Sequence, residues 1–477
     1  MTKALVLAGT RSGCGKTSVA LGLMRALARQ GLRVQPFKAG PDFIDPGLHA
    51  RAAGRASHNL DTWMMPPEAL RACFARFAGE ADVVLIEGAM GLFDGRSGAD
   101  EEGSTAHLAK LLGLPVLLVL DVAAQARSVA AVALGFARFD PALRLSGVVL
   151  NRVASPRHEA ILRQAMATLP DVPVLGCLPR AESLGLASRH LGLVVAEDVA
   201  ELDARLEALA DWVEQGVDIP ALLAGMPELR LLEISAPAPH VSPDASPDLS
   251  PAVSRGSRVR IGLARDRAFC FVYAENLRLL EEAGAEIVPF SPLCDAALPK
   301  DLDGLYLPGG YPELSAAALS ANAPMLAAVR AFCGPGGKGR PVWAECGGFM
   351  YLQRALVDSG GAEHAQCGVF PGRAVMRTRR AALGYREART LAPGPLGPEG
   401  TLLRGHEFHY SELEQAGLAA GEQGQAAFAL TASDGQTVFD GAALGNVVGG
   451  YFHAHLGSNP AAARSFVAAC RAAHQKT

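Results

Sequence analysis

The sequence predicts an α/β protein with two parallel-sheet domains, and two observations support this fold class. Short apolar runs alternate with segments of helical periodicity along most of the chain, as parallel sheets covered by helices require. The alternation stops at residues 235–257, which are rich in Pro, Ser and Ala and too poor in large apolar residues to fold. We therefore expect domains at 1–234 and 258–477 joined by a linker, with a proline-rich ligand for a partner as the alternative for 235–257.

Size and composition limit the function classes. A chain of 477 residues is too long for one hydrophobic core. The formal charge of −4 gives no basic surface for nucleic acid, and no apolar run reaches the ~20 residues that span a bilayer. Nine cysteines without paired spacing favour reduced thiols over a disulfide framework or a zinc site. Because the N-terminus also lacks the features of a signal peptide, we expect a cytoplasmic protein.

The first expected strand runs into a glycine-rich turn, VLAGTRSGCGKT, at residues 6–17. Gly13 and Gly15 allow backbone N–H groups to turn toward an anion, at the N-terminus of the helix that follows. Lys16 can then reach the outer phosphates of a nucleotide, and Thr17 can offer its hydroxyl to a magnesium ion. A tight glycine turn without a ligand is the alternative interpretation.

This loop departs from the usual G-x-x-x-x-G-K-[ST] spacing. Thr10 stands where the first glycine belongs, and Gly9 comes one residue too early. The second half, RSGCGKT, resembles the variant loop K-G-G-x-G-K-T of a nucleotide-binding superfamily that includes dethiobiotin synthetase and the Min/Par ATPases. Arg11 occupies the position of that variant's first lysine.

The rest of the first domain is expected to bring polar side chains to one edge of its sheet. Further strands are predicted at 32–40, 82–87, 115–123, 146–153 and 172–180, and a closing helix at 197–223. Ligands of parallel sheets bind at the carboxyl ends of the strands. The sequence places six candidates there: Asp42, Asp45, Glu87, Asp94, Asp121 and Asn151.

The second domain has a different pattern with its own candidate site. Strands are predicted at 259–266, 286–293, 303–308 and 341–345, and a helix at 268–285. Cys346 follows one strand and precedes a helix, an elbow that exposes a nucleophile and places its sulfur near a helix N-terminus. Gly309 and Gly310 can present backbone N–H groups to a tetrahedral oxyanion. A buried structural cysteine is the alternative.

A base must accept the thiol proton, and two histidines in YFHAHL are candidates. His453 lies at an expected strand exit about a hundred residues after the cysteine, and His455 has a nearly equal formal claim. His406 and His409 in RGHEFHYS suit a structural or substrate-facing role better than a metal site, because no third ligand is evident.

Motifs of both halves resemble one family. GTRSGCGKT, FKAGPDFIDP, IEGAMGLFDG and LDVAAQARSVAA are similar to a dethiobiotin-synthetase-like ATP-binding domain. AECGGFMYL, LPGGYPEL, RGHEFHYS and YFHAHL are similar to the glutamine amidotransferase domain of the cobyrinate/cobyric acid synthase type. Together they resemble the cobyrinate a,c-diamide synthase family over almost the full length, except the linker. The resemblance implies a P-loop-type N-terminal domain and a class I glutamine amidotransferase-like C-terminal domain.

The resemblance also implies a carbon–nitrogen ligase of cobalamin biosynthesis. Such enzymes use ATP and Mg²⁺ to convert the a and c acetate carboxylates of cobyrinate into acyl phosphates, which ammonia from glutamine turns into amides. The expected partners are therefore a corrin precursor, ATP and glutamine, with neither nucleic acid nor membrane, and a homodimer is the oligomer to test for. Arg377, Arg379, Arg380 and Arg386 form a candidate patch for the polyanionic substrate, with a solvated basic loop as the alternative.

Within the first domain the resemblance suggests roles for five residues. Asp45 and Glu87 are expected to bind magnesium, and Asp94 to contact metal, substrate or ammonia. Lys38 would stabilise the charge that is transferred, and Asn151 resembles the base-recognising asparagine of related ATP enzymes. Each has a plainer alternative: turns for Asp42, Asp45 and Asp94, a surface position for Glu87 or Lys38, and a turn cap for Asn151.

In the second domain the resemblance implies that Cys346 attacks the glutamine amide and that His453 acts as base. The usual triad has a glutamate two residues after its histidine, but here that position is His455. The orienting acid is therefore not identified, and Glu345 is one candidate.

Rival functions share parts of these motifs. A Par/Min-type ATPase switch would use the first domain but not the cysteine elbow. The same amidation on hydrogenobyrinate or nickel sirohydrochlorin, or cobyric acid synthase activity, would use both domains. AFCFVYAENLRLL resembles the cobalt-containing cobyrinate branch more closely.

Overall fold

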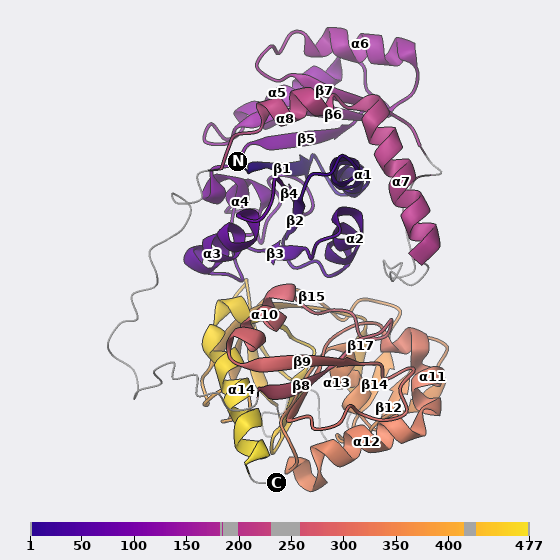
Figure 1. Ribbon diagram of the computed structural model, residues 1–477, viewed down its shortest axis with the longest axis vertical. Coiled ribbons are helices and arrows are strands. Elements are labelled where there is room, and N and C mark those ends of the chain that lie inside the picture. Colours follow the sequence, from indigo (N-terminus) through magenta and orange to yellow (C-terminus); the bar gives the residue numbers. More distant parts are fainter. Residues whose placement is uncertain (1, 182–183, 185–198, 230–257, 415–425, 476–477) are drawn as a thin grey trace, which may run out of the picture. The chain divides into compact units, whose positions relative to one another are not determined.

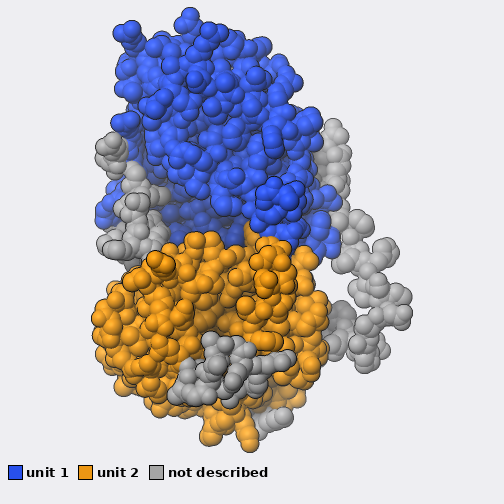
Figure 2. Space-filling view, turned by 180° about the vertical axis from the view of Figure 1, so that it is seen from behind, with its two compact units in different colours: residues 1–239 blue, residues 240–477 orange. Residues whose placement is uncertain are grey.

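The computed structural model describes residues 2–181, 184, 199–229, 258–414 and 426–475. The chain divides into two compact units, residues 1–239 and 240–477, which are coloured separately in Figure 2. The linker predicted at 235–257 lies outside the described residues. The two units are therefore considered one at a time.

Unit 1 is built on a seven-stranded sheet with the order β3-β2-β4-β1-β5-β6-β7. Every neighbouring pair in it is parallel, as the sequence predicts. β1 lies in the middle, so the loop after it emerges at the centre of the carboxyl edge. The strands are β1 (Lys3–Gly9), β2 (Val34–Ala39), β3 (His58–Leu60), β4 (Val83–Glu87), β5 (Val116–Asp121), β6 (Leu145–Val153) and β7 (Val174–Pro179).

Helices cover both faces of this sheet (Figure 1). One hydrophobic core lies under α1, α7 and α8, and the other under α3 to α6, because alternate residues of each buried strand point to opposite faces. The helices are α1 (Lys16–Arg29), α2 (Ile44–Ala53), α3 (Pro67–Ala78), α4 (Thr105–Leu112), α5 (Ser128–Arg138), α6 (Pro156–Met166), α7 (Val199–Gly216) and α8 (Ile219–Gly225).

The structure corrects two details of the expected unit 1. β3 was not predicted, because three residues are too few to show a strand period. The closing helix is divided into α7 and α8, and the Asp218 side chain between them accepts a hydrogen bond from the Ala221 N–H, 2.9 Å away. An N-cap of this kind begins a new helix.

Unit 2 contains a six-stranded sheet with the order β20-β21-β11-β10-β8-β9. All of its pairs are parallel except β20 with β21. Its strands are β8 (Val259–Ala264), β9 (Ala285–Phe290), β10 (Gly304–Leu307), β11 (Val342–Glu345), β20 (Ala442–Leu444) and β21 (Val447–Gly450). The α/β prediction for this unit is confirmed, with one antiparallel edge strand added.

Two further sheets of unit 2 were not predicted. One has the order β13-β12-β14-β17, and the other, fully antiparallel, has the order β19-β18-β15-β16-β22. Their strands are β12 (Ala355–Val357), β13 (Glu363–Ala365), β14 (Arg373–Met376), β15 (Ala382–Thr390), β16 (Leu402–His409), β17 (Ser411–Glu414), β18 (Phe428–Ala432), β19 (Thr437–Asp440) and β22 (His453–His455).

The helices of unit 2 differ from expectation mainly at residues 268–285. The helix there, α10, spans only Ala274–Glu282, because the aromatic residues before it are buried in a loop instead. The other helices are α11 (Ala316–Ala321), α12 (Ala323–Cys333), α13 (Gly347–Leu352) and α14 (Pro460–His474), with the 3₁₀ turns η2 (Pro312–Ser315), η3 (Pro335–Gly337) and η4 (Leu456–Ser458).

All nine cysteines are free thiols, as predicted. Within the described ranges, no single helix has both the length and the apolar composition to cross a membrane. The helices at 312–321 and 323–337 meet that test only when taken together, and they are bent by 96° at the break between them.

Candidate functional sites

The glycine loop of unit 1 lies between β1 and α1 and has the conformation that a phosphate cradle needs. Gly13 and Gly15 have φ values of 76° and 92°, a region that favours glycine. A Cβ on Gly15 would lie 2.1 Å from Asn151 Nδ2, and this same amide donates a hydrogen bond to the Cys14 carbonyl at 2.8 Å. Asn151, near the carboxyl end of β6, therefore fixes the backbone of the loop at Cys14 and Gly15.

The unusual spacing of the loop has a packing explanation. Cys14 is fully buried, and a Cβ on Gly9 would lie 2.3 Å from its sulfur. Gly9 is thus required by the inward-pointing Cys14 side chain, one residue earlier than the usual loop would place a glycine. The Arg11 guanidinium instead donates a hydrogen bond to Asp121 Oδ2, at the end of β5, at 2.7 Å.

The two residues expected to bind nucleotide and metal contact the end of β4 and the loop after it. Lys16 is buried, and its ammonium donates to the Met90 carbonyl at 3.0 Å. The Thr17 hydroxyl donates to Glu87 Oε1 at 2.6 Å. The P-loop residues and the carboxylate of β4 are therefore adjacent, although they are far apart in the sequence.

A buried ion cluster continues from Glu87. The Lys38 ammonium lies 2.5 Å from Asp45 Oδ2 and 3.1 Å from Glu87 Oε1. Burial alone would lower the pKa of Lys38, but the charges of Glu87 and Asp45 outweigh it and raise the pKa. Burial, followed by repulsion from Glu87, raises the pKa of Asp45 to about 7. The solvent-facing alternative for Lys38 is excluded, because only 3 % of its side chain is exposed.

His49 is a member of this cluster that the sequence reasoning missed. Its Nε2 lies 2.6 Å from Glu87 Oε2, and its Nδ1 lies 3.2 Å from the Ser57 hydroxyl. Burial opposes the ionisation of Glu87, yet Lys38 and His49 lower its pKa below the usual range. The only available signal was the spacing of Asp45 and His49, four residues apart on one face of α2.

Other candidates of unit 1 have different partners. Asp42 Oδ1 accepts hydrogen bonds from the Ile44 and Asp45 N–H groups, so Asp42 caps the turn into α2. Asp94 is exposed, and its Oδ2 accepts from the Gly91 N–H at 2.8 Å. For both aspartates the structure shows the turn contacts of the plainer interpretation.

The oxygen donors of unit 1 fit a magnesium site. The Thr17 hydroxyl, Glu87 and Asp45 would supply hard oxygen ligands of the kind that Mg²⁺ takes beside a nucleotide. Glu87 Oε1 contacts both the Thr17 hydroxyl and the Lys38 ammonium, and Lys38 supplies the positive charge between the Glu87 and Asp45 carboxylates.

In unit 2, Cys346 forms the predicted elbow between β11 and α13. Its φ of 44° and ψ of −104° are strained for a residue other than glycine. A Cβ on Gly348 would lie 2.0 Å from the Leu307 carbonyl oxygen, so the turn requires a glycine at that position. Burial, and next the charge of Glu313, raise the pKa of the Cys346 thiol far above its usual value.

The glycine turn after β10 and the first residue of β22 converge on this elbow. A Cβ on Gly347 would lie 3.0 Å from the Gly310 nitrogen, and a Cβ on Gly309 would lie 2.3 Å from His453 Cε1. His453 is buried, and burial together with the neighbouring His406 and His409 lowers its pKa well below the usual value. The predicted oxyanion turn is therefore in contact both with the candidate base His453 and with Gly347, the residue after the candidate nucleophile.

Glu345 contacts the backbone beside the candidate base. Its Oε1 accepts from the Ala454 N–H at 2.8 Å, and its Oε2 accepts from the Tyr306 hydroxyl at 2.7 Å. Since Ala454 lies between His453 and His455, Glu345 fixes the short strand β22. The His406 ring stacks on His453 with centroids 5.1 Å apart, which agrees with the expected structural role of His406.

Two other features of unit 2 are less suited to a reaction. Arg377 and Arg386 of the predicted basic patch pair with Glu412 and Glu407, so part of their charge is compensated.

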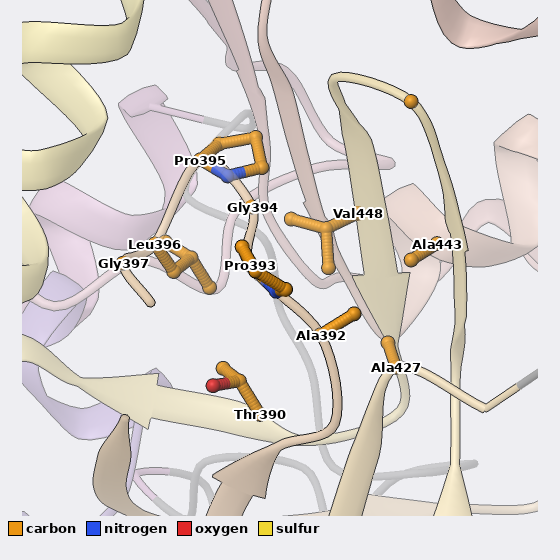
Figure 3. Close-up of a pocket in the computed structure, with 11 residues that line it drawn as sticks. Thr390, Ala392, Pro393, Gly394, Pro395, Leu396, Gly397, Ala427, Ala443 and Val448 are labelled. Carbon is orange, nitrogen blue, oxygen red and sulfur yellow. The ribbon is translucent and has the colours of Figure 1, made fainter. Parts of the chain in front are cut away.

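A small pocket, shown in Figure 3, is lined mostly by alanine, glycine and proline. Its one polar side chain, Thr390, donates to the Pro398 carbonyl at 2.9 Å, so the pocket offers no charged group to a substrate.

Comparisons with known families match each unit separately. Residues 5–194 match the CobQ/CobB/MinD/ParA nucleotide binding domain, and residues 260–461 match the CobB/CobQ-like glutamine amidotransferase domain. The first match includes the glycine loop and the Lys38 cluster. The second includes the Cys346 elbow and His453.

Relatives match the whole chain. A cobyrinate a,c-diamide synthase of Syntrophotalea carbinolica is 45 % identical over 98 % of both chains. A hydrogenobyrinate a,c-diamide synthase of Rhodobacter capsulatus is 48 % identical over 94 % of this chain and 98 % of its own length. A cobyrinate a,c-diamide synthase of Salmonella typhimurium is 42 % identical over 98 % of both. The chain therefore belongs to the family of cobyrinate and hydrogenobyrinate a,c-diamide synthases, which are glutamine amidotransferase ligases.

Proposed function

We propose that this chain amidates the a and c acetate carboxylates of cobyrinate, using ATP, Mg²⁺ and glutamine. The observation that carries the proposal is the presence, in one polypeptide, of a phosphate loop beside a carboxylate cluster and of a cysteine elbow beside a histidine. The first can activate an acid and the second can release ammonia, and amide synthesis needs both.

In unit 1 the substrate carboxylate would attack the γ-phosphorus of ATP, forming an acyl phosphate and releasing ADP. Phosphoryl transfer depends mainly on positioning and charge neutralisation. Lys16 and the Gly13–Gly15 backbone would hold the phosphates, and Lys38 would stabilise the charge on the transferred group. When bound through Thr17, Asp45 and Glu87, Mg²⁺ would neutralise phosphate charge. Ammonia would then displace phosphate from the acyl carbon.

In unit 2 the Cys346 sulfur would add to the side-chain amide carbon of glutamine. His453 would take the thiol proton and return it to the leaving nitrogen as the C–N bond breaks, giving a thioester and ammonia. Water would then cleave the thioester to glutamate. The N–H groups after β10, at Gly309 and Gly310, would stabilise the oxyanion.

A second candidate substrate is hydrogenobyrinate, because the Rhodobacter capsulatus relative that bears this name is 48 % identical. The test incubates the chain with ATP, Mg²⁺ and glutamine and either cobyrinate, hydrogenobyrinate or nickel sirohydrochlorin. Mass spectrometry should show two amide-for-acid changes on cobyrinate. Amidation of another ring alone would reassign the substrate, and amidation of none would contradict the proposal. A homodimer and a cytoplasmic location stay predictions.

A further inference from the structure

Glu313 lies beside the candidate nucleophile but has no role in the reaction described above. It belongs to η2, which follows the Gly309–Gly310 turn after one residue. A Cβ on Gly347 would lie 2.9 Å from Pro312 Cδ, so η2 packs directly against the Cys346 elbow. The charge of Glu313 is, after burial, a cause of the raised pKa of the Cys346 thiol.

The charge of Glu313 is uncompensated, in contrast to other acids of unit 2. Glu345 accepts two hydrogen bonds, and Glu407 pairs with Arg386 at 2.6 Å. Over the described ranges, no side chain donates a hydrogen bond to the Glu313 carboxylate or forms an ion pair with it. Burial raises its pKa to about 7, although its half-buried side chain can still be reached by a ligand.

Above about pH 7, where Glu313 is mostly ionised, this arrangement opposes catalysis unless a cation is added. A negative charge next to a thiol disfavours the thiolate, which is the nucleophilic form. A half-buried carboxylate without a cation is also unfavourable in itself. Both penalties are relieved if the substrate supplies a positive charge at this position, and glutamine carries such a charge on its α-ammonium group.

We propose that Glu313 binds the α-ammonium group of glutamine and thereby selects α-amino acid amides over simple amides. The inference rests on the proposed glutamine hydrolysis in unit 2. The ion pair neutralises Glu313 without transfer of a proton, so the substrate itself removes the repulsion that opposes thiolate formation at Cys346. Glu313 is thus a specificity-determining residue whose effect on the nucleophile depends on the correct ligand.

The test compares L-glutamine with glutaramate, which has the same amide and carboxylate but no α-ammonium group. Ammonia release is measured with the full chain for the wild type and for Glu313→Gln. The wild type should prefer glutamine by roughly 100-fold in kcat/KM, because an unpaired buried charge is left with glutaramate. Glu313→Gln should reduce the preference to less than about tenfold.

The ratio of the two substrates within one sample does not depend on the fraction that is folded. Glu286→Gln, an exposed substitution on β9, is the matched control and should keep the wild-type ratio. Glu313→Asp retains the charge and should keep a preference above tenfold. Equal hydrolysis of both amides by the wild type, or an unchanged ratio in Glu313→Gln, would overturn the inference alone. Hydrolysis of neither amide by the wild type would overturn the proposed function as well.

Discussion

The cluster around Glu87 and the elbow around Cys346 are both buried, yet the two sites differ in how neighbouring charges act on their buried ionisable groups. In unit 1, Glu87 contacts Lys38 and His49, and Asp45 contacts Lys38, so each charge has a partner within 3.1 Å. Neighbouring opposite charges outweigh burial at Lys38 and Glu87, whereas the pKa of Asp45 is still raised to about 7 by burial and by Glu87. Lys38 and Glu87 can therefore remain ionised before any ligand binds.

At the Cys346 elbow of unit 2, neighbouring charges do not offset the effect of burial on the pKa values of Cys346 and His453. The thiol pKa of Cys346 is raised and the pKa of His453 is lowered, so the neutral pair is favoured over thiolate and imidazolium. This difference matches the proposed chemistry of each centre. Phosphoryl transfer needs fixed charges that neutralise phosphate, whereas a cysteine that stays neutral without substrate is protected from oxidation and unproductive attack.

The strongest test of this contrast removes the nucleophile. Cys346→Ala should lower glutamine-dependent synthesis by at least about 10⁴-fold, because no thioester can form. Synthesis with added ammonium salt should continue, since unit 1 is unchanged. The measurement is mass spectrometry of the corrin product with each nitrogen source.

Cys333→Ala, which truncates another buried thiol of unit 2, is the control and should keep both activities. Normal use of glutamine by Cys346→Ala would show that another residue is the nucleophile.

The complementary substitution acts on unit 1. Lys16→Ala should lower synthesis with either nitrogen source by about 10²- to 10³-fold, since it removes one preorganised charge at the phosphates. Ammonia release from glutamine should persist at a measurable level. Lys110→Ala, which removes a lysine paired with Glu101 and Asp140 on the surface, should leave synthesis unchanged. Full synthesis by Lys16→Ala would contradict the phosphate-binding role.

The comparison also shows what a single sequence can predict. The glycine loop at 6–17 and the Cys346 elbow are local, because a strand, a turn and a helix follow one another within about twenty residues. Both motifs could therefore be predicted from the sequence without a structure. The parallel sheets were predicted for the same reason, since their alternation of strand and helix is visible along the chain.

Features that depend on contacts between residues far apart in the sequence could not be predicted from the sequence. His49 meets Glu87 across 38 residues, and Glu345 meets Ala454 across 109. The residues around His49 and around Glu345 show no local sequence pattern that identifies the partner of either side chain. The two further sheets of unit 2 were missed because most of their strands are short, with three to five residues.

A third prediction concerns His49, which the structure alone identifies. His49→Phe leaves Glu87 Oε2 without its 2.6 Å partner, so the carboxylate is less well oriented toward a metal. The affinity for Mg²⁺ with a non-hydrolysable ATP analogue should fall by about 10- to 100-fold. Titration calorimetry measures it directly.

Ser57→Ala is the graded control for His49→Phe, because Ser57 touches only the far nitrogen of His49, at 3.2 Å, and its loss should have a smaller effect. An unchanged affinity in His49→Phe would mean that Glu87 does not need this support.

The smallest expected effect is one of stability and concerns Glu345. Burial raises its pKa from an ordinary value of 4.5 to about 8. Between these two values the folded chain keeps a proton that the unfolded chain loses, so the stability contribution present below pH 4.5 is lost as the pH rises toward 8. Glu345→Gln cannot ionise, so its free energy of unfolding should fall less steeply over this range.

At low pH, Glu345→Gln should differ from the wild type by only about 1 kcal/mol, because a neutral amide replaces a neutral acid in the same two contacts. Urea unfolding of the full chain at several pH values measures the slope, and Glu281→Gln on the exposed face of α10 should reproduce the wild-type curve. A slope in Glu345→Gln equal to that of the wild type would show that Glu345 is already ionised when the chain is folded. Cys346 would then have a permanent negative neighbour, and the charge contrast between the two centres would be weaker than described.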